Sequence, residues 1–202
     1  MNSNPEFSKY YYHKLQLFEK LDGFLAISES SASEAITYLN VDKDRVFNIS
    51  SACNKKIFNS YNNDSPKINI VALHPFLLYS GACDPRKNVK SLLEAFSLLS
   101  EDYQKYKLVL CGKLLEQETE LIGEWIDLFK INSNNIVQIG YVSDNELSTL
   151  YRHCSLFVFS SLHEGFGLPV LEAMSCGAPV IGSNRTSIPE VIASEWAMFD
   201  PK

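Results

Sequence analysis

A short stretch of the chain combines two carboxylates with two glycines. Glu164 stands directly before Gly165-Phe-Gly167, and Glu172 follows inside an apolar run that predicts a helix over 168–175. Two glycines let the backbone turn with exposed N–H groups, and a helix start adds partial positive charge, so the stretch suits a phosphate. Carboxylates accept hydrogen bonds from paired hydroxyls, so both glutamates suit a ribose diol or sugar hydroxyls. Either glutamate alone could equally offset the helix dipole.

Two adjacent cations form a second candidate group. Arg86 and Lys87 follow a predicted strand over 76–80 and precede a helical pattern over 88–100. The guanidinium presents a planar fork and the ammonium a point charge, and together they can neutralise a diphosphate. The alternative is a solvated charged turn. The glycine loop lies at the same predicted sheet edge, which favours the diphosphate.

Other residues at predicted strand ends give weaker signals. Gly81 and Gly112 end two strands, and Lys113 either reaches a ligand or is exposed. Tyr141 and Val142 either border a bound base or belong to core and turn, and His163 either touches a sugar or packs near Glu164. The sequence predicts no metal site and no cofactor, because the histidines lack metal-ligand spacing and no Asp-x-Asp occurs where an ion would bind.

Strand-like and helix-like segments alternate along the chain. Strands are predicted at 24–27, 46–49, 76–80, 108–111, 136–139, 156–159 and 180–181, and helices at 30–39, 88–100, 116–130, 144–153, 168–175 and 188–193. Short buried strands alternating with amphipathic helices indicate an α/β fold, a Rossmann-like doubly wound parallel sheet. Ligands bind outside the carboxyl ends of such strands, where nearly all of the candidate residues lie. The polar stretch 54–67 predicts a loop or linker.

Composition narrows the class of protein. The 202 residues suit one medium domain plus part of another, and the net charge of −6, without a basic stripe, argues against nucleic acid. Five cysteines, none in a CxxC pair, and an N-terminus without a signal pattern predict a reducing cytoplasm. No apolar run is long enough to span a membrane, and peripheral attachment stays open.

Several ordered motifs resemble the group 1 glycosyltransferases (family 4, GT-B fold), over about 23–201. These are Gly81-Ala-Cys-Asp-Pro-Arg-Lys-Asn-Val, Gly140-Tyr-Val-Ser-Asp, Ser160-Ser-Leu-His-Glu-Gly-Phe-Gly-Leu-Pro-Val-Leu-Glu and Ile188-Pro-Glu-Val. The resemblance implies a retaining, metal-independent transfer from a nucleoside diphosphate sugar, of GDP-mannose or UDP-glucose type, to a glycan or lipid-linked acceptor in polysaccharide biosynthesis. It implies that Arg86 and Lys87 hold the diphosphate and Glu164 the sugar. It also implies that the amides of Phe166, Gly167 and Leu168 meet sugar and phosphate, and that Glu172 binds the ribose.

The resemblance also implies a division of the chain. Residues 1–53 resemble the tail of the N-terminal, acceptor-side domain, 54–75 a linker, and 76–202 the donor-binding domain, truncated at its C-terminus. The rest of the N-terminal domain is then a missing partner, and the chain is expected to be a fragment. Ala82 replaces the Arg or Thr of many relatives, which leaves Arg86 to supply the cation. The enzyme would act in the cytoplasm or at the inner face of the membrane.

Two rival functions remain. One is a nucleotide-sugar-binding module without catalysis, since intact donor residues fit both functions. The other is a sugar-nucleotide 2-epimerase of the same fold, which the 164–172 string disfavours. A dehydrogenase is disfavoured too, because no Gly-x-Gly-x-x-Gly follows a strand.

Overall fold

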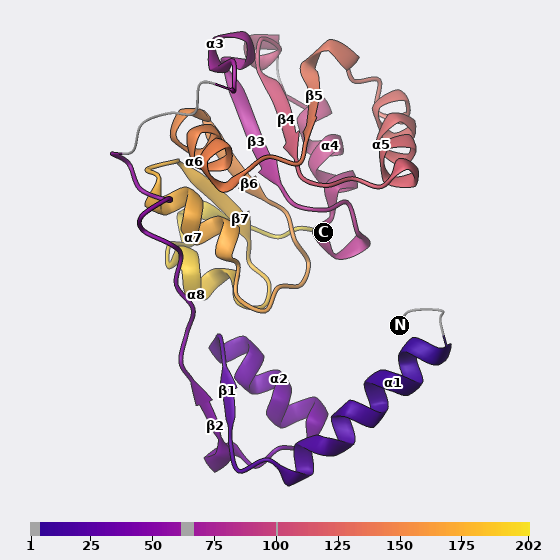
Figure 1. Ribbon diagram of the computed structural model, residues 1–202. Coiled ribbons are helices and arrows are strands. Elements are labelled where there is room, and N and C mark those ends of the chain that lie inside the picture. The colour runs from indigo at the N-terminus through magenta and orange to yellow at the C-terminus, as the bar shows by residue number, and fades with distance from the viewer. Residues whose placement is uncertain (1–4, 62–66, 100) are drawn as a thin grey trace. The chain divides into compact units, whose positions relative to one another are not determined.

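The computed structural model describes residues 5–61, 67–99 and 101–202, which form two compact units, Met1–Ser51 and Ala52–Lys202 (Figure 1). In the first unit, a small sheet of two parallel strands accompanies two helices. The order is α1 (Pro5–Gln16), β1 (Phe24–Ala26), α2 (Glu29–Leu39) and β2 (Val46–Asn48), with 3-10 turns at Leu17–Lys20 and Lys43–Arg45. Ser28 caps the start of α2, because the Ser31 amide donates to the Ser28 hydroxyl oxygen at 2.9 Å.

The second unit is built on one six-stranded parallel sheet. Its strands are β3 (Phe76–Ser80), β4 (Lys107–Cys111), β5 (Ile136–Gly140), β6 (Leu156–Phe159), β7 (Val180–Ser183) and β8 (Met198–Phe199). Its helices are α3 (Ile70–Leu73), α4 (Val89–Ser97), α5 (Glu116–Leu128), α6 (Asp144–His153), α7 (Leu168–Ser175) and α8 (Ile188–Ile192). Shorter 3-10 turns lie at Pro85–Lys87, Glu101–Tyr103, Ser133–Asn135 and Glu195–Ala197.

The strand order is β5-β4-β3-β6-β7-β8, and every neighbouring pair is parallel. From β3 the chain adds β4 and β5 on one side. It then crosses back to place β6 on the other side of β3, and β7 and β8 follow beyond β6. This confirms the predicted doubly wound sheet. The order reverses between β3 and β6, the place where such sheets bind ligands beyond the carboxyl ends of their strands.

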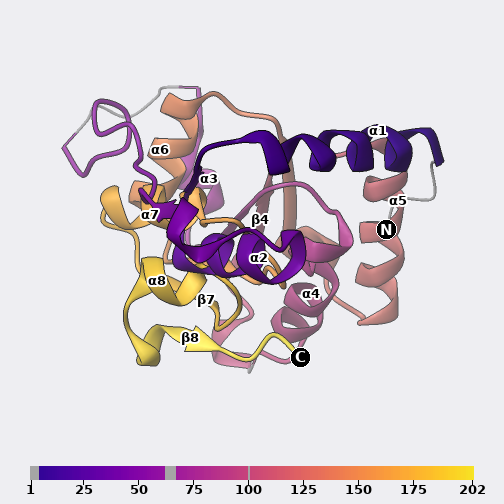
Figure 2. The ribbon, with the colours of Figure 1, turned by 90° about the horizontal axis from the view of Figure 1, so that it is seen from below.

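Helices cover both faces of this sheet, as a parallel sheet requires. Figures 1 and 2 show α6, α7 and α8 on one side and α4 and α5 on the other. The sheet has a hydrophobic core on each face, and alternate residues of β3 point into the two cores. Phe76 and Leu78 pack with Tyr151 and Val170 on the α6 and α7 side. Tyr79 packs on the α4 and α5 side. Period-two alternation explains why the central strands read as continuous apolar runs.

The segment expected as a linker, 54–75, packs on the second unit where the structure describes it. Phe58 is buried in the core on the α6 and α7 side, with Ile57 and Ile68 packed against the same cluster, and α3 lies within the segment. Residues 62–66 of the linker and residue 100 of the predicted 88–100 helix lie outside the described residues. The sequence analysis missed α1, α3 and the two-residue β8. Among the helices described, none is long and apolar enough to cross a membrane.

Candidate functional site

Two loops meet beyond the carboxyl ends of β3 and β6. The first contains the 3-10 turn Pro85–Lys87, whose start is capped by Asp84. The Leu162 amide donates to the Arg86 carbonyl at 2.6 Å, and the Ser160 hydroxyl donates to the Lys87 carbonyl at 2.9 Å. The β6 loop therefore holds the backbone that carries both predicted cations.

An ion pair joins these loops through their side chains. Lys87 Nζ lies 2.6 Å from Glu164 Oε1, with only 18% and 14% of the two side chains exposed. The ammonium also lies over the Phe159 ring, 5.6 Å from its centroid. The structure thus brings together the two predicted residues of opposite charge at the point where the strand order reverses.

A third loop fixes the backbone of Glu164. Its amide donates to Thr186 Oγ1 at 3.0 Å, and its carbonyl accepts from the Ser187 hydroxyl at 3.0 Å. Both partners follow β7 and precede α8. Together with Ser160, these are positioning residues that the sequence analysis missed. Ser160 directly follows the predicted strand 156–159, but Thr186 and Ser187 lie several residues after the strand 180–181, so no local pattern singled out the three residues.

Three glycines lie side by side at the ends of β3, β4 and β5. The Gly81 amide donates to the Cys111 carbonyl at 2.8 Å, and the Gly112 amide donates to the Gly140 carbonyl at 2.9 Å. At Gly112 φ is +150°, and a Cβ there would stand 2.1 Å from the Gly81 carbonyl oxygen, so no other residue fits. Because these three residues are glycines, only backbone atoms lie at the ends of β3, β4 and β5. A ligand can therefore approach the strand ends closely.

The N-terminus of α7 begins at the predicted glycine loop. Gly167 is the N-cap, with φ of +105°, and it has no side chain to cap the first helical amides. A Cβ at this position would stand 2.7 Å from Ile188 Cδ1, so the end of that side chain would have to shift, and the positive φ itself favours glycine. Pro169 has no N–H, and the Val170 amide donates to the Gly167 carbonyl at 3.0 Å, so the Leu168 amide and the helix dipole are what this start offers to an anion. Phe166 is half-buried beside it, and Leu168 is exposed.

Glu172 lies within α7 and is half-buried, and its carboxyl group has no hydrogen-bond partner among the described residues. Burial raises the pKa of this carboxyl to about 7, and the nearby Asp144 charge at the start of α6 adds to the increase. A carboxylate in this setting gains free energy from any hydroxyl donor that reaches it.

Arg86 points back to its own loop. Its Nε lies 3.1 Å from Asp84 Oδ1, and 64% of its side chain is exposed. Lys113, Tyr141 and His163 are exposed as well. Val142, in contrast, packs against the buried cluster that contains Tyr151.

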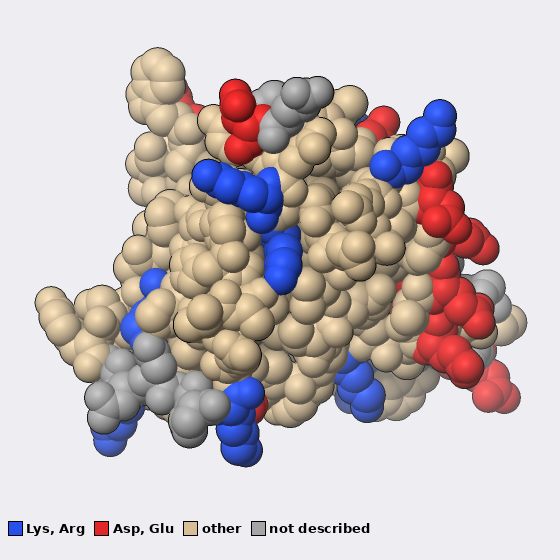
Figure 3. Space-filling view, turned by 90° about the horizontal axis from the view of Figure 1, so that it is seen from above, with Lys and Arg blue, Asp and Glu red and all other residues tan. Residues whose placement is uncertain are grey.

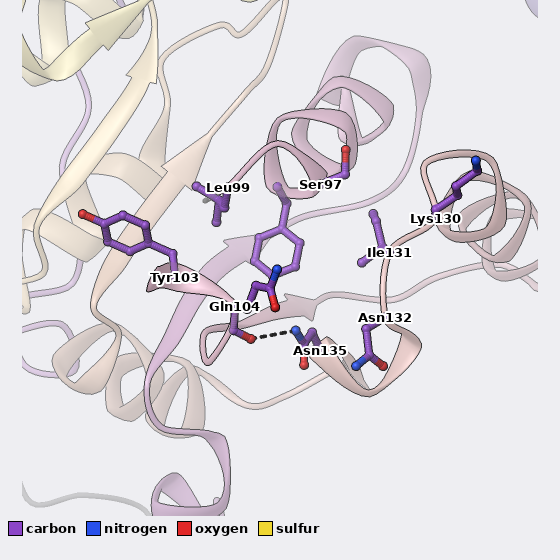
Figure 4. Close-up of a pocket in the computed structure, with 9 residues that line it drawn as sticks. Ser97, Leu99, Tyr103, Gln104, Lys130, Ile131, Asn132 and Asn135 are labelled. Carbon is purple, nitrogen blue, oxygen red and sulfur yellow. Dashed lines mark hydrogen bonds between the residues drawn. The ribbon is translucent and has the colours of Figure 1, made fainter. Parts of the chain in front are cut away.

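A cavity of about 260 Å³ lies away from these loops (Figure 4). Its lining comes from the end of α4 and from segments that precede β4 and β5, so it lies at the amino ends of the strands. Asn135 lines this cavity and donates to the Gln104 carbonyl at 2.9 Å. Figure 3 shows the same end of the second unit, where lysines and arginines are scattered and carboxylates gather along one edge. Among the described residues, no group of three or more His, Cys, Asp or Glu side chains could hold a metal ion.

Comparisons with known proteins agree with this geometry. Residues 60–201 match the model of the family described as Glycosyl transferases group 1. The serotype-specific mannosyltransferase WbdA of Escherichia coli is 42% identical over 98% of this chain, which spans 25% of WbdA. The Escherichia coli O-antigen chain mannosyltransferase B is 36% identical over 94% of the chain and 51% of its own length. The chain therefore spans only a quarter to a half of these relatives.

Solved structures share the fold. A sucrose-phosphate synthase from Thermosynechococcus elongatus superposes with a TM-score of 0.81 at 22% identity, over 100% of this chain and 51% of that one. Anabaena HepE, solved in complex with UDP and glucose, gives 0.74 at 19% identity, over 93% and 52%. The parallel sheet, the loops at its order reversal and the family match lead to one conclusion: the chain belongs to the group 1 glycosyltransferases and contains a half of their GT-B fold.

Proposed function

We propose that the second unit is the donor-binding half of a retaining hexosyltransferase. The enzyme moves a hexose from a nucleoside diphosphate sugar to a glycan or lipid-linked acceptor in polysaccharide biosynthesis. The observation that carries the proposal is the Lys87–Glu164 pair, 2.6 Å long and beside the uncapped start of α7, at the reversal of the strand order. The cation and the amides that can bind an anion, and the carboxylate that can accept hydrogen bonds from hydroxyl groups, are all within that one set of loops.

Each group has one role in this proposal. Lys87, Arg86 and the amides at the start of α7 bind the diphosphate, and Glu164 accepts hydrogen bonds from the sugar. Glu172 accepts hydrogen bonds from the ribose hydroxyls, because a half-buried carboxylate is stabilised by hydrogen-bond donors. The row of glycines across β3, β4 and β5 admits the nucleotide to the strand ends.

Mannose is the proposed sugar. Two relatives, at 42% and 36% identity, are described as mannosyltransferases, which favours a donor of the GDP-mannose type. A donor of the UDP-glucose type is the second candidate, because the similar HepE structure contains UDP and glucose.

Electrostatic stabilisation of the leaving diphosphate is the proposed source of catalysis. Negative charge grows on the phosphate as the glycosidic bond breaks, and preorganised donors lower the barrier without reorganising. Lys87 is held in place by Glu164 and by its fixed backbone, so it is preorganised in this sense. The proposal uses no divalent ion, and the displaced phosphate takes the acceptor proton on the same face of the sugar.

The acceptor and the remaining part of the enzyme are also proposals. The acceptor binds to the other half of the GT-B fold, of which residues 1–53 are a piece. We place the enzyme in the cytoplasm or at the inner face of the membrane, since all five cysteines are free thiols, as in a reducing compartment.

Calorimetry with GDP, GDP-mannose, UDP and UDP-glucose tests the proposal on this chain. We expect one nucleotide pair to bind, with an affinity that EDTA leaves unchanged. Binding of none would overturn the proposal. A transfer assay with an added acceptor-side half then separates the enzyme from its rival, since binding without transfer or donor hydrolysis identifies a binding module.

A further inference from the structure

We propose that Glu164 competes with the donor diphosphate for Lys87, so that the site favours an intact sugar nucleotide over the free nucleoside diphosphate. This inference rests on the proposed function. It concerns the discrimination between substrate and product, which the family match does not address.

The ion pair occupies the cation that the diphosphate requires. Lys87 Nζ and Glu164 Oε1 are 2.6 Å apart, and both side chains are more than four-fifths buried, with exposures of 18% and 14%. The neighbouring pair, Arg86 with Asp84, has exposures of 64% and 31%, so water screens it far more. Any phosphate that recruits Lys87 must therefore displace or share a partly desolvated carboxylate.

The backbone of Glu164 is held in place when this happens. Its amide and carbonyl are both hydrogen-bonded to the loop after β7, through Thr186 and Ser187 at 3.0 Å each. The Lys87 carbonyl is bonded to Ser160. Both backbones are fixed, so ligand binding changes the side-chain partners and leaves the carboxylate facing the phosphate.

The free energy then depends on what the ligand offers Glu164. A free nucleoside diphosphate takes Lys87 and brings further negative charge, which leaves a largely buried carboxylate without compensation. A sugar nucleotide takes the same cation but presents sugar hydroxyls, which donate to that carboxylate. The cost of an uncompensated Glu164 carboxylate thus applies only to the free nucleoside diphosphate, which is the product of the transfer.

Two consequences follow for binding. In the wild-type chain, a free hexose strengthens the binding of the nucleoside diphosphate, because its hydroxyls compensate Glu164, and the coupling is reciprocal. In Glu164→Gln, the competing charge is absent, so the free diphosphate gains affinity while the sugar nucleotide gains little or loses.

The test measures Kd by calorimetry at pH 8 for GDP against GDP-mannose, and for UDP against UDP-glucose. We expect Glu164→Gln to bind the free diphosphate roughly tenfold more tightly, the size of one charged hydrogen bond, and to lower the preference for the sugar nucleotide by at least as much. Asp200→Asn is the matched control, because it makes the same change in a 2.6 Å pair with Arg185 that is not part of the proposed site. The control should leave the ratio of the two Kd values unchanged.

A second measurement needs no variant. Saturating free mannose, or glucose for the UDP pair, should tighten the binding of the diphosphate to the wild-type chain several-fold. If Glu164→Gln does not fold, as judged by circular dichroism, this coupling alone decides. Nucleotide binding with no hexose coupling, or with a Kd ratio that Glu164→Gln leaves unchanged, overturns the inference but not the proposed function. Absence of nucleotide binding by the wild-type chain overturns both.

Discussion

Positive charge beyond the ends of β3 and β6 resides on Arg86 and Lys87, and each has a carboxylate partner. The two pairs differ in burial, so we propose different roles for the two cations. Lys87 is held beneath its partner and over an aromatic ring, so it is preorganised for one position. Arg86 is mostly exposed, so water screens its pair with Asp84 and a phosphate can replace that partner at little cost.

Removal of Lys87 should therefore impair transfer more than removal of any exposed lysine. We expect Lys87→Ala to raise the barrier by about 2–4 kcal/mol, the cost of losing one preorganised donor. The measurement is kcat/KM of the enzyme with its acceptor-side half present. Lys105→Ala, an exposed lysine at the opposite end of the sheet, is the control and should leave kcat/KM near its wild-type value. Full turnover by a folded Lys87→Ala enzyme would contradict this role.

Glu172 predicts a pH dependence of stability. Burial raises its pKa to about 7 in the folded chain, above the value of 4.5 expected when unfolded. The folded state therefore holds the proton more tightly, and the stability that this contributes is fully present below pH 4.5 and is lost as the pH rises to about 7. Glu172→Gln does not titrate, so we expect it to be more stable than wild type by about 1–2 kcal/mol at pH 8, after allowing for solvent screening.

Thermal melts at pH 5 and pH 8 measure this difference. The advantage of Glu172→Gln should be much smaller at pH 5 than at pH 8. An advantage that is the same at both pH values would show that the carboxyl is not the source. In the wild type, nucleotide affinity should rise with pH while stability falls. The reason is that Glu172 ionises, and its carboxylate is a stronger acceptor for ribose hydroxyls than the protonated carboxyl.

At the scale of elements, the strand ends make the site possible by bringing loops together. The β6 loop holds the β3 loop, and the β7 loop holds Glu164. The glycines at the ends of β3 and β4 approach so closely that only the absence of a side chain permits it. Packing of the strand ends, rather than helix propensity, sets the geometry here.

Gly112→Ala tests this close approach. The new Cβ would stand 2.1 Å from the Gly81 carbonyl oxygen at a φ of +150°, so the strand ends must separate. We expect a loss of about 2–4 kcal/mol in the free energy of unfolding, a sum of backbone strain and overpacking. Gly123→Ala is the matched control in α5, where a Cβ meets nothing within 4 Å, and it should stabilise by about 0.5–1 kcal/mol. Urea denaturation gives both values, and equal effects would refute the packing argument.

Local signals determined which elements the sequence could predict. The bounds of α6 were predicted to the residue, because Ser143 and Glu146 form a reciprocal cap at its start. The β8 strand has only Met198 and Phe199 and therefore shows no periodicity, and α1 has a weak apolar face with three exposed tyrosines. Such segments depend on tertiary contacts for their structure.

The candidate site shows the same division. The positions of Lys87 and Glu164 at one sheet edge followed from the alternation of strands and helices. Their contact did not, since 77 residues separate them and only the strand order places β3 beside β6. The hydroxyl groups of Ser160, Thr186 and Ser187 position the backbone, a role that no local pattern reveals. Whether the predicted site residues bind a donor stays a prediction.

At the scale of the whole molecule, the chain consists of two compact units, and all of the loops of the candidate site lie in the second. The chain covers 25% of the length of WbdA and 51% of that of mannosyltransferase B. We therefore propose that donor binding belongs to the second unit alone. The cavity of Figure 4, at the amino ends of the strands, has no ligand role in this proposal.

The central claim is that a nucleotide binds to the loops after β3 and β6. Amide hydrogen exchange tests it most directly, measured on the full chain alone and with whichever of GDP and UDP binds more tightly. The account predicts slower exchange in the loops after β3 and β6 and at the start of α7, across residues 81–88 and 160–170. Exchange in residues 24–48, and in residues 97–104 and 130–135 around the cavity, should not change. Protection centred on the cavity residues, with residues 81–88 and 160–170 unaffected at saturating nucleotide, would contradict the account.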